Sequence, residues 1–344
     1  MKAGDKVPLR AQAPVMLTRM GFGGAPLGNL YRAVSEENAQ AALRAAHDGG
    51  VRYFDTAPLY GLGLSEERFG RAFAGFGEDV ALSTKIGRWL EDCAPGEVTP
   101  ASFVDVPQRR YVFDYTYDGV MRSHEDSLKR LGVEAVDILL VHDVDVFTHG
   151  SREASEEKIR ELFDGGGYRA LTELKDAGRI KAIGAGVNEW QVCERLLDEG
   201  AFDCFLLAGR YTLLEQEALD SFLPRCERDD IGIILGGPYN SGILATGAVE
   251  GAKYNYNAAP PDILERVRRI EEICTAHGVR LIEAALQFVL HHPAVRTVIP
   301  GAVSAEEVNA NIALLAREIP TGLWADLKSA GLLRADAPIS EHQP

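Results

Sequence analysis

The sequence predicts an α/β fold in which eight parallel strands and their helices form a single (β/α)8 barrel. Short apolar runs alternate with helical patterns along the chain, which is typical of a parallel sheet. A glycine usually stands between each helical pattern and the apolar run that follows it. The length of 344 residues also suits one barrel of about 250 residues with long loops, so we expect one domain over residues 1–344.

The first half of the chain supplies four of the expected strands. Met20 to Pro26 predict the first strand and its turn. Ser35 then begins a helix that Gly49 and Gly50 end, because Ser35 is a capping residue followed by acids and by alanines on one helical face. The next three strands are expected at residues 51–54, 80–84 and 136–141.

A stretch between Gly87 and Asp118 is too long for a plain connection after the third strand. It contains Trp89, several other aromatic residues and three prolines. We expect this long loop to form a lid or a substrate wall over Tyr60, with Trp89 as a candidate substrate contact. A helix from Gly119 to Leu131 follows it.

The second half supplies four further strands, a C-terminal extra helix and a polar tail. The strands are expected at residues 180–185, 202–207, 231–235 and 295–299. Helical patterns cover residues 263–274 and 282–290, and another helix begins at Ser304. The tail beyond Ala330 is polar and contains proline, so we expect it to fray.

Composition excludes several classes of function and favours a cytoplasmic protein. The net charge is −15, and no cluster of Lys and Arg longer than a pair attracts nucleic acid or an anionic membrane. No run approaches the about 18 apolar residues of a membrane span, and residues 1–15 lack the apolar segment of a signal peptide. The five cysteines are scattered, which favours a reducing compartment. Oligomeric state is not indicated.

Four polar side chains are expected to meet at one end of the barrel. Asp55, Lys85 and His142 each follow an apolar run, and Tyr60 lies just beyond Asp55. Parallel barrels carry their chemistry at the carboxyl ends of the strands. A buried lysine beside a tyrosine lowers the phenol pKa from its usual value of about 10, so we expect Tyr60 to exchange a proton near neutral pH. Asp55 would hold Lys85, and His142 would orient a substrate oxygen.

The sequence gives less support to a metal site or to the nucleotide-binding motifs of other folds. His142 and His149, with Asp143 and Asp145 between them, could suggest a metal site, but no second histidine pair at a strand end supports it, and we expect no metal. No complete G-x-G-x-x-G motif occurs, and a P-loop is absent.

The four polar residues carry a resemblance to a known family. Asp55-Thr56-Ala57, Tyr60-Gly61, Ser83-Thr84-Lys85 and Leu140-Val141-His142-Asp143 resemble the catalytic tetrad pattern of the aldo-keto reductase superfamily. The resemblance extends from about Met20 to about Ala330. It implies a TIM barrel with its core over about residues 20–330, a nicotinamide cofactor bound without a Rossmann domain, and Tyr60 as acid and base.

The resemblance also implies where the cofactor binds. Segments after the seventh and eighth strands wrap it in the family, and a polar residue after the fifth strand holds the carboxamide. The candidate cofactor-binding residues are Gly24, Asn188, Gly236, Gly237, Asn240, Gly242, Leu244, Gly301, Glu307 and Asn311.

The cofactor is expected to be NAD and not NADP. Family members that use NADPH place Lys or Arg after the last strand, where this chain has Val303 and Glu307. An acid would repel a 2′-phosphate and accept a hydrogen bond from a 2′-hydroxyl. Ser304 to Glu307 also fit a capping box, and both roles can hold. Ala208 and Gly236 stand where the family has a glutamine and a tyrosine.

Three segments narrow the resemblance to one branch. Gly184 to Trp190, Leu206 to Gln216 and Gly236 to Leu244 resemble the branch with L-fucose (D-threo-aldose) 1-dehydrogenase and pyridoxal 4-dehydrogenase. Both enzymes oxidise a cyclic hemiacetal to a lactone with NAD. We therefore expect a small-molecule substrate, first an aldose such as L-fucose and alternatively pyridoxal. A remote alternative is a nucleotide-binding sensor or partner subunit with little turnover.

Overall fold

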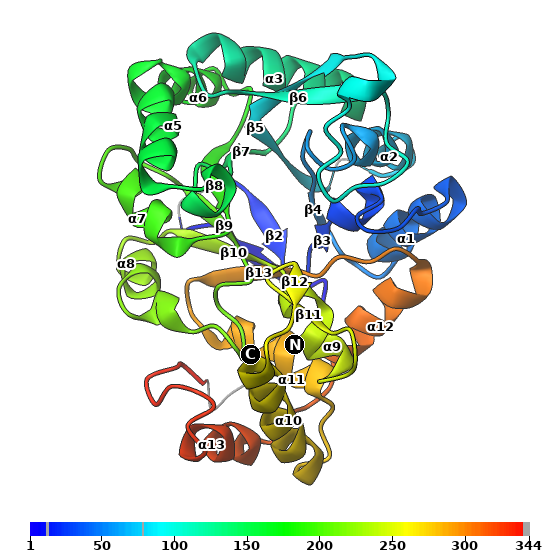
Figure 1. Cartoon of the computed structure of the whole chain (residues 1–344), viewed down its shortest axis with the longest axis vertical. Coiled ribbons are helices and arrows are strands. Elements are labelled where there is room, and N and C mark those ends of the chain that lie inside the picture. The colour runs from blue at the N-terminus through cyan, green and yellow to red at the C-terminus, as the bar shows by residue number, and fades with distance from the viewer. Residues whose placement is uncertain (12–13, 78, 340–344) are drawn as a thin grey trace.

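The fold is a nearly closed barrel of parallel strands, which confirms the predicted class. The computed structural model describes residues 1–11, 14–77 and 79–339. Neighbouring strands follow chain order around the sheet, and bridges from Met20 to Val298 and from Gly23 to Gly301 bring the first strand beside the last. Helices surround the strands (Figure 1). The barrel strands are β3 (Phe22–Gly23), β4 (Tyr53–Asp55), β5 (Ala81–Asp92), β7 (Ile138–His142), β8 (Ala182–Val187), β9 (Cys204–Ala208), β10 (Gly232–Gly236) and β13 (Val295–Ile299).

The outer helices begin where capping residues predict. The Ser35 and Ser304 hydroxyls accept hydrogen bonds from the backbone N–H groups of Asn38 and Glu307, which satisfies donors that a helix leaves free. The helices are α1 (Glu36–Asp48), α2 (Leu64–Phe73), α3 (Tyr117–Leu131), α4 (Val146–His149), α5 (Arg152–Asp164), α6 (Gly167–Asp176), α7 (Trp190–Leu197), α8 (Phe222–Arg228), α9 (Ile243–Thr246), α10 (Pro261–Ala276), α11 (Leu281–Phe288), α12 (Ala305–Leu315) and the extra helix α13 (Thr321–Ser329).

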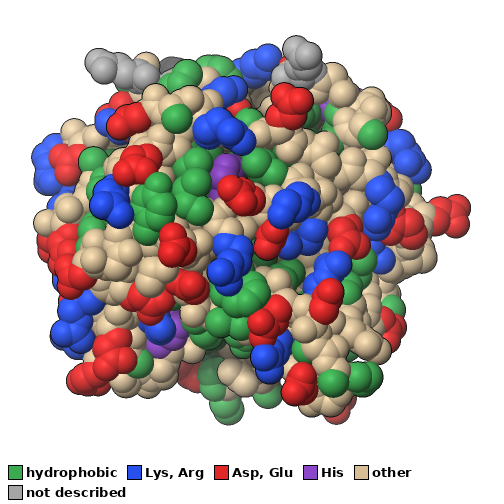
Figure 2. All heavy atoms as spheres, turned by 90° about the horizontal axis from the view of Figure 1, so that it is seen from above, with side chains coloured by type: hydrophobic (Ala, Val, Ile, Leu, Met, Phe, Trp, Pro, Cys, Tyr) green, Lys and Arg blue, Asp and Glu red, His purple; other side chains and the backbone are tan. Residues whose placement is uncertain are grey.

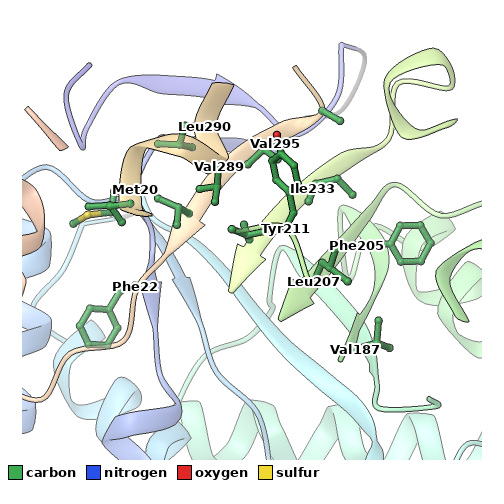
Figure 3. Close-up of a cluster of buried hydrophobic side chains, with 14 of the residues drawn as sticks. Met20, Phe22, Val187, Phe205, Leu207, Tyr211, Ile233, Val289, Leu290 and Val295 are labelled. Atoms are coloured by element: carbon green, nitrogen blue, oxygen red, sulfur yellow. The ribbon is translucent and has the colours of Figure 1, made fainter. Parts of the chain in front are cut away.

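Alternate strand residues build two apolar layers. Leu139 and Val141 of β7 belong to the layer between strands and helices, whereas Ile138 and Leu140 belong to a second cluster. This division follows from the two-residue period of a strand. Figure 3 shows part of the larger layer, with strand residues such as Phe205 and Leu207 and with Tyr211, Val289 and Leu290 from the segments that cover the strands.

An N-terminal hairpin that the sequence did not predict completes the second cluster. Strands β1 (Lys6–Pro8) and β2 (Met16–Thr18) pair antiparallel. Leu9, Val15 and Leu17 pack with the barrel-interior residues Tyr53, Ala81, Ile138, Leu140, Ala182, Cys204, Leu206, Ile234 and Ile299. Because Leu9 lies against Gly232, the first residue of β10, the hairpin covers the amino-terminal end of the barrel.

The long stretch after the third barrel strand is partly a sheet extension. Strand β5 continues past Lys85 to Asp92 and pairs antiparallel with β6 (Arg109–Asp114). The short helix η2 (Pro95–Glu97) lies between them. Farther along the chain, β11 (Lys253–Tyr254) and β12 (Asn257–Ala258) form another small hairpin. The β5–β6 extension and the β11–β12 hairpin both contribute residues to the cavities described below.

The prediction that the tail beyond Ala330 frays is wrong for the described part of that tail. Leu332, Leu333 and Ala337 are buried, because they pack against the main apolar layer. The Arg334 backbone N–H donates to the Gln216 side chain, and the Lys328 ammonium donates to the Ala337 carbonyl. Residues 340–344 lie outside the described residues.

The surface has no large region of one charge on the face that Figure 2 shows, where acidic and basic side chains are interspersed. Within residues 1–11, 14–77 and 79–339, no single helix has the length and apolar character to cross a membrane. Helix α10 and the segment Leu281–His291 pass that test only as a pair, with a bend of 100° between them.

Candidate active site

The barrel brings the four predicted tetrad residues to the carboxyl ends of its strands. Asp55 ends β4, Lys85 lies within β5, and His142 ends β7. Tyr60 lies on the connection between β4 and α2. Parallel strands place these positions side by side, and all four side chains line one or both of two adjoining cavities.

Lys85 and Asp55 form a buried ion pair. The Lys85 ammonium lies 2.8 and 2.7 Å from the two Asp55 carboxylate oxygens and 2.8 Å from the Thr56 carbonyl oxygen. The Ser83 hydroxyl also donates to Asp55, at 2.7 Å. Burial raises the pKa of Asp55, while Lys85 and Ser83 act against that rise. These contacts hold the ammonium 4.8 Å from the centre of the Tyr60 ring.

Tyr60 remains protonated near neutral pH, which contradicts the predicted lowering of its pKa. Burial raises the pKa of Tyr60 well above its ordinary value, and the charges of Asp55 and Asp143 raise it further. The Lys85 ammonium donates its hydrogen bonds to Asp55 and Thr56. The Asp55 carboxylate therefore offsets much of the positive charge that would otherwise stabilise the Tyr60 phenolate. With its phenol protonated, Tyr60 can therefore act as a proton donor.

His142 is a neutral hydrogen-bonding group beside Tyr60. The two rings meet edge to face, with centres 5.9 Å apart. Burial lowers the pKa of His142 well below its ordinary value, and the charges of Arg88 and Lys85 lower it further. Nε2 lies 3.4 Å from an Asp143 carboxylate oxygen, and Nδ1 has no hydrogen-bond partner among the described residues. A neutral imidazole with a free nitrogen can bind a substrate oxygen.

The first cavity, which we call the inner pocket, contains Tyr60, Lys85 and His142. Its volume is about 410 Å³, within the range of small-molecule sites. Aromatic and apolar side chains form most of its wall, namely Leu30, Leu59, Phe103, Tyr111, Phe147 and Tyr256. Phe103 and Tyr111 belong to the long stretch after the third barrel strand, so that stretch does line a wall beside Tyr60.

The second cavity, which we call the glycine groove, meets the inner pocket at Tyr60. The two share Ala25, Leu30, Tyr60, Leu206, Ala208 and Tyr256. Among the candidate cofactor-binding residues, Gly24, Gly236, Gly237, Asn240, Gly242 and Gly301 line the groove.

The remaining candidates lie elsewhere. Asn188 lines the inner pocket, where its amide donates to Asp143 at 3.2 Å. Leu244 is fully buried in the apolar core, and Asn311 accepts a hydrogen bond from Tyr239. Glu307 accepts from the Val303 N–H and pairs with Arg32, so it acts at least as a capping residue. None of these last three residues lines either cavity.

The groove suits a dinucleotide because backbone forms much of its wall. A Cβ atom on Gly24 would lie 2.7 Å from the Asp55 carbonyl oxygen, and one on Gly301 would lie 2.5 Å from Pro26. Gly237 adopts a φ of 60°, a conformation that favours glycine. Arg210 adds a cation that donates to the Asn188 carbonyl and the Asn255 side chain and lies 3.7 Å from the Glu215 carboxylate. Glycine backbone and a cation are suited to binding phosphate groups.

Arg88, and not Trp89, lies along the inner pocket. Trp89 packs against Arg122, whose guanidinium lies 4.5 Å from the indole centre. Gly87 adopts a φ of 101°, which interrupts the alternation of side chains along β5. Arg88 therefore follows Lys85 on the pocket side. Sequence reasoning named Trp89 and not Arg88, and strict alternation from Lys85 would also have pointed to Trp89.

Asp143 is a second residue that sequence reasoning assigned no role here. It adopts a φ of 50°, and its carboxylate contacts Arg88, His142 and Asn188. Burial raises the pKa of Asp143 to about 6, although Arg88 acts against that rise. Its position directly after His142 was the available signal. Across the described ranges, no group of three or more His, Cys, Asp or Glu side chains is arranged to hold a metal ion.

Comparisons with known proteins find similarity over nearly the whole chain and agree with the barrel fold. Residues 19–331 match the model of the Aldo/keto reductase family. The chain is 41% identical to pyridoxal 4-dehydrogenase of Microbacterium luteolum, over 97% of this chain and 99% of that protein. It is 37% identical to D-threo-aldose 1-dehydrogenase of a Pseudomonas species, over 95% and 98%. The holo form of aldo-keto reductase AKR11C1 from Bacillus halodurans superposes with a TM-score of 0.74 at 24% identity, covering 98% of this chain and 99% of that chain.

Proposed function

The chain belongs to the aldo/keto reductase family, and on that premise we propose that it oxidises pyridoxal, as its cyclic hemiacetal, to the lactone with NAD. Family membership makes it an oxidoreductase that acts on CH–OH groups with NAD(P). The sequence alone led us to expect an aldose substrate first. The order is reversed here because the pyridoxal enzyme is the more similar of the two relatives, at 41% against 37% identity.

One observation carries the proposal, namely that Tyr60, Lys85 and His142 share an aromatic pocket that adjoins the glycine groove at Tyr60. A substrate carbon in the inner pocket would then lie beside a nicotinamide ring in the groove. The aromatic wall suits a flat heteroaromatic ring, because such rings stack on aromatic side chains.

Each tetrad residue has a separate task in this reaction. NAD bound in the groove supplies the hydride acceptor. Tyr60, as the phenolate, accepts the proton of the hemiacetal hydroxyl while the carbon–hydrogen bond breaks and the lactone carbonyl forms. Asp55 holds the Lys85 ammonium beside the Tyr60 ring, where its charge would offset part of the negative charge of the phenolate. His142 lines the same pocket and would orient the substrate oxygen through its imidazole.

An aldose such as L-fucose is the second candidate, favoured by the similarity to D-threo-aldose 1-dehydrogenase. The reacting group is again a cyclic hemiacetal, so the same residues serve. For either substrate we propose a preference for NAD, supported by Glu307 at the start of α12 and by the absence of Lys or Arg between Gly301 and Asn311. Arg32 pairs with Glu307, and a cation at this position would instead favour the 2′-phosphate of NADP.

Steady-state assays of NADH formation test substrate and cofactor together. The expected result is a kcat/KM that is higher for pyridoxal than for L-fucose, and higher with NAD than with NADP. A higher value for L-fucose would replace pyridoxal by the aldose, and a higher value with NADP would reject the preference for NAD. Tight binding of NAD without turnover of either substrate would favour a nucleotide-binding sensor.

A further inference from the structure

Arg88 is a buried cation at the wall of the inner pocket. Its side chain is only 4% exposed. Its guanidinium carbon lies 4.6 Å from the centre of the Phe113 ring and 5.5 Å from that of Tyr111. Nη2 lies 2.9 Å from an Asp143 carboxylate oxygen. A buried arginine in this setting keeps its charge at any physiological pH.

Two of the guanidinium nitrogens are unmatched. Nε and Nη1 of Arg88 are buried and have no hydrogen-bond partner in the part of the chain that the structure describes. Buried donors are normally satisfied, because an unpaired one has a substantial energetic cost. Asp143 cannot satisfy them all, since its carboxylate also contacts His142 and Asn188. Because Arg88 also lines the inner pocket, an oxygen of a bound ligand would supply the missing acceptor.

The position of Arg88 relative to the reacting atoms indicates which group that is. Arg88 lines the same pocket as Tyr60 and His142, and a single Asp143 oxygen lies 2.9 Å from Arg88 and 3.4 Å from His142. A substrate that His142 contacts therefore lies in the same pocket as Arg88. One substrate in this pocket can therefore present an oxygen to each of the two side chains.

We propose that Arg88 binds an acidic oxygen next to the reacting carbon of the substrate, which in pyridoxal is the 3-oxygen of the ring. This inference rests on the proposed function. The 3-oxygen is attached to the ring atom adjacent to the one that carries the hemiacetal carbon, and it ionises more readily than a sugar hydroxyl. A guanidinium binds such an oxygen through charge-assisted hydrogen bonds. Arg88 then distinguishes pyridoxal from neutral hemiacetals.

The experiment compares pyridoxal with 3-deoxypyridoxal, which lacks only that oxygen, in the wild type and in Arg88→Met. The kcat/KM for pyridoxal should fall about 10- to 100-fold in the variant, the loss of a hydrogen bond to a charged group. The value for 3-deoxypyridoxal should change less than about threefold, and Arg88→Lys should restore part of the loss. Equal losses for both substrates would reject the proposal and leave Arg88 a structural role.

Controls separate this result from misfolding and from failure of the proposed function. Arg122→Met, which removes the arginine stacked on Trp89 outside the pocket, should leave the ratio of the two kcat/KM values unchanged. Melting temperature and the Kd for NAD should match the wild type in Arg88→Lys. If the wild type oxidises neither compound, the proposed function fails. The Kd values of the two corresponding lactones then test Arg88 alone, and equal weakening of both in Arg88→Met overturns the inference.

Discussion

At the scale of single residues, Tyr60 controls the pH dependence of the proposed reaction. Its pKa is raised because burial and the charges of Asp55 and Asp143 disfavour the phenolate. Oxidation needs the phenolate as proton acceptor, and the phenolate fraction grows about tenfold per pH unit below the pKa. The kcat/KM for oxidation should therefore rise with pH through the alkaline range, and that for reduction should not. His142 stays neutral at these pH values because its pKa is lowered.

The measurement is a pH profile of kcat/KM for oxidation, recorded at saturating NAD. A slope near one on logarithmic axes between about pH 7 and 9 agrees with a phenol of unlowered pKa. A profile that is already flat at pH 7 would show that the phenol ionises near neutrality, as the sequence alone suggested.

Replacement of the Tyr60 hydroxyl tests its role directly. Tyr60→Phe keeps the ring contacts with His142 and Phe103 and removes only the group that exchanges the proton. We expect kcat to fall by about 10²- to 10⁴-fold, the range of general acid–base catalysis, with the Kd for NAD nearly unchanged. Tyr117→Phe, at the start of α3, is the matched control and should stay active, because it removes a hydroxyl that donates to Glu173 away from both cavities. An active Tyr60→Phe enzyme would exclude the mechanism.

At the scale of elements, the short helix η1 (Ala25–Gly28) positions the Tyr60 loop by close backbone contact. A Cβ atom on Gly28 would lie 2.5 Å from the Tyr60 carbonyl carbon and 2.6 Å from the Gly61 nitrogen. Backbone atoms cannot swing aside as the end of a side chain can. The two segments pack this closely only because Gly28 has no side chain.

Gly28→Ala should therefore displace Tyr60. We expect a loss of stability of about 1–3 kcal/mol, typical of overpacking, together with a lower kcat. Gly96→Ala is the matched control, because a Cβ atom at Gly96 meets nothing within 4 Å. Urea denaturation and steady-state kinetics measure the two effects. Unchanged kcat in Gly28→Ala would mean that η1 does not set the position of Tyr60.

At the scale of the whole molecule, the N-terminal hairpin completes the barrel core. Leu17 is fully buried among residues of the barrel interior, whereas its neighbour Met16 is 47% exposed. The hairpin thus stabilises strands from around the barrel, including β4, β7 and β9, at the end opposite the candidate active site.

Leu17→Ala should destabilise the fold by about 2–5 kcal/mol, because it removes a buried side chain and leaves a cavity. Met16→Ala should change stability by no more than about 0.5 kcal/mol. The comparison is made by urea denaturation or by melting temperature. Equal, small effects of the two substitutions would show that the hairpin does not support the barrel.

The sequence by itself determined the barrel, the helix starts at Ser35 and Ser304, and the convergence of Asp55, Tyr60, Lys85 and His142. Periodicity, capping residues and the order of strands can all be read along the sequence. A parallel barrel then brings the carboxyl ends of its strands, and the residues that follow them, to one end of the fold.

Only the tertiary structure decided which side chains reach the site and in what state. The positive φ of Gly87 puts Arg88 and not Trp89 in the pocket, and the apolar tail residue Leu332 packs where polarity suggested fraying. The pKa of Tyr60 rises although a lysine stands beside it. Each outcome depends on burial and on groups far apart in the chain, because desolvation and electrostatic fields act through space and are set only when the chain has folded.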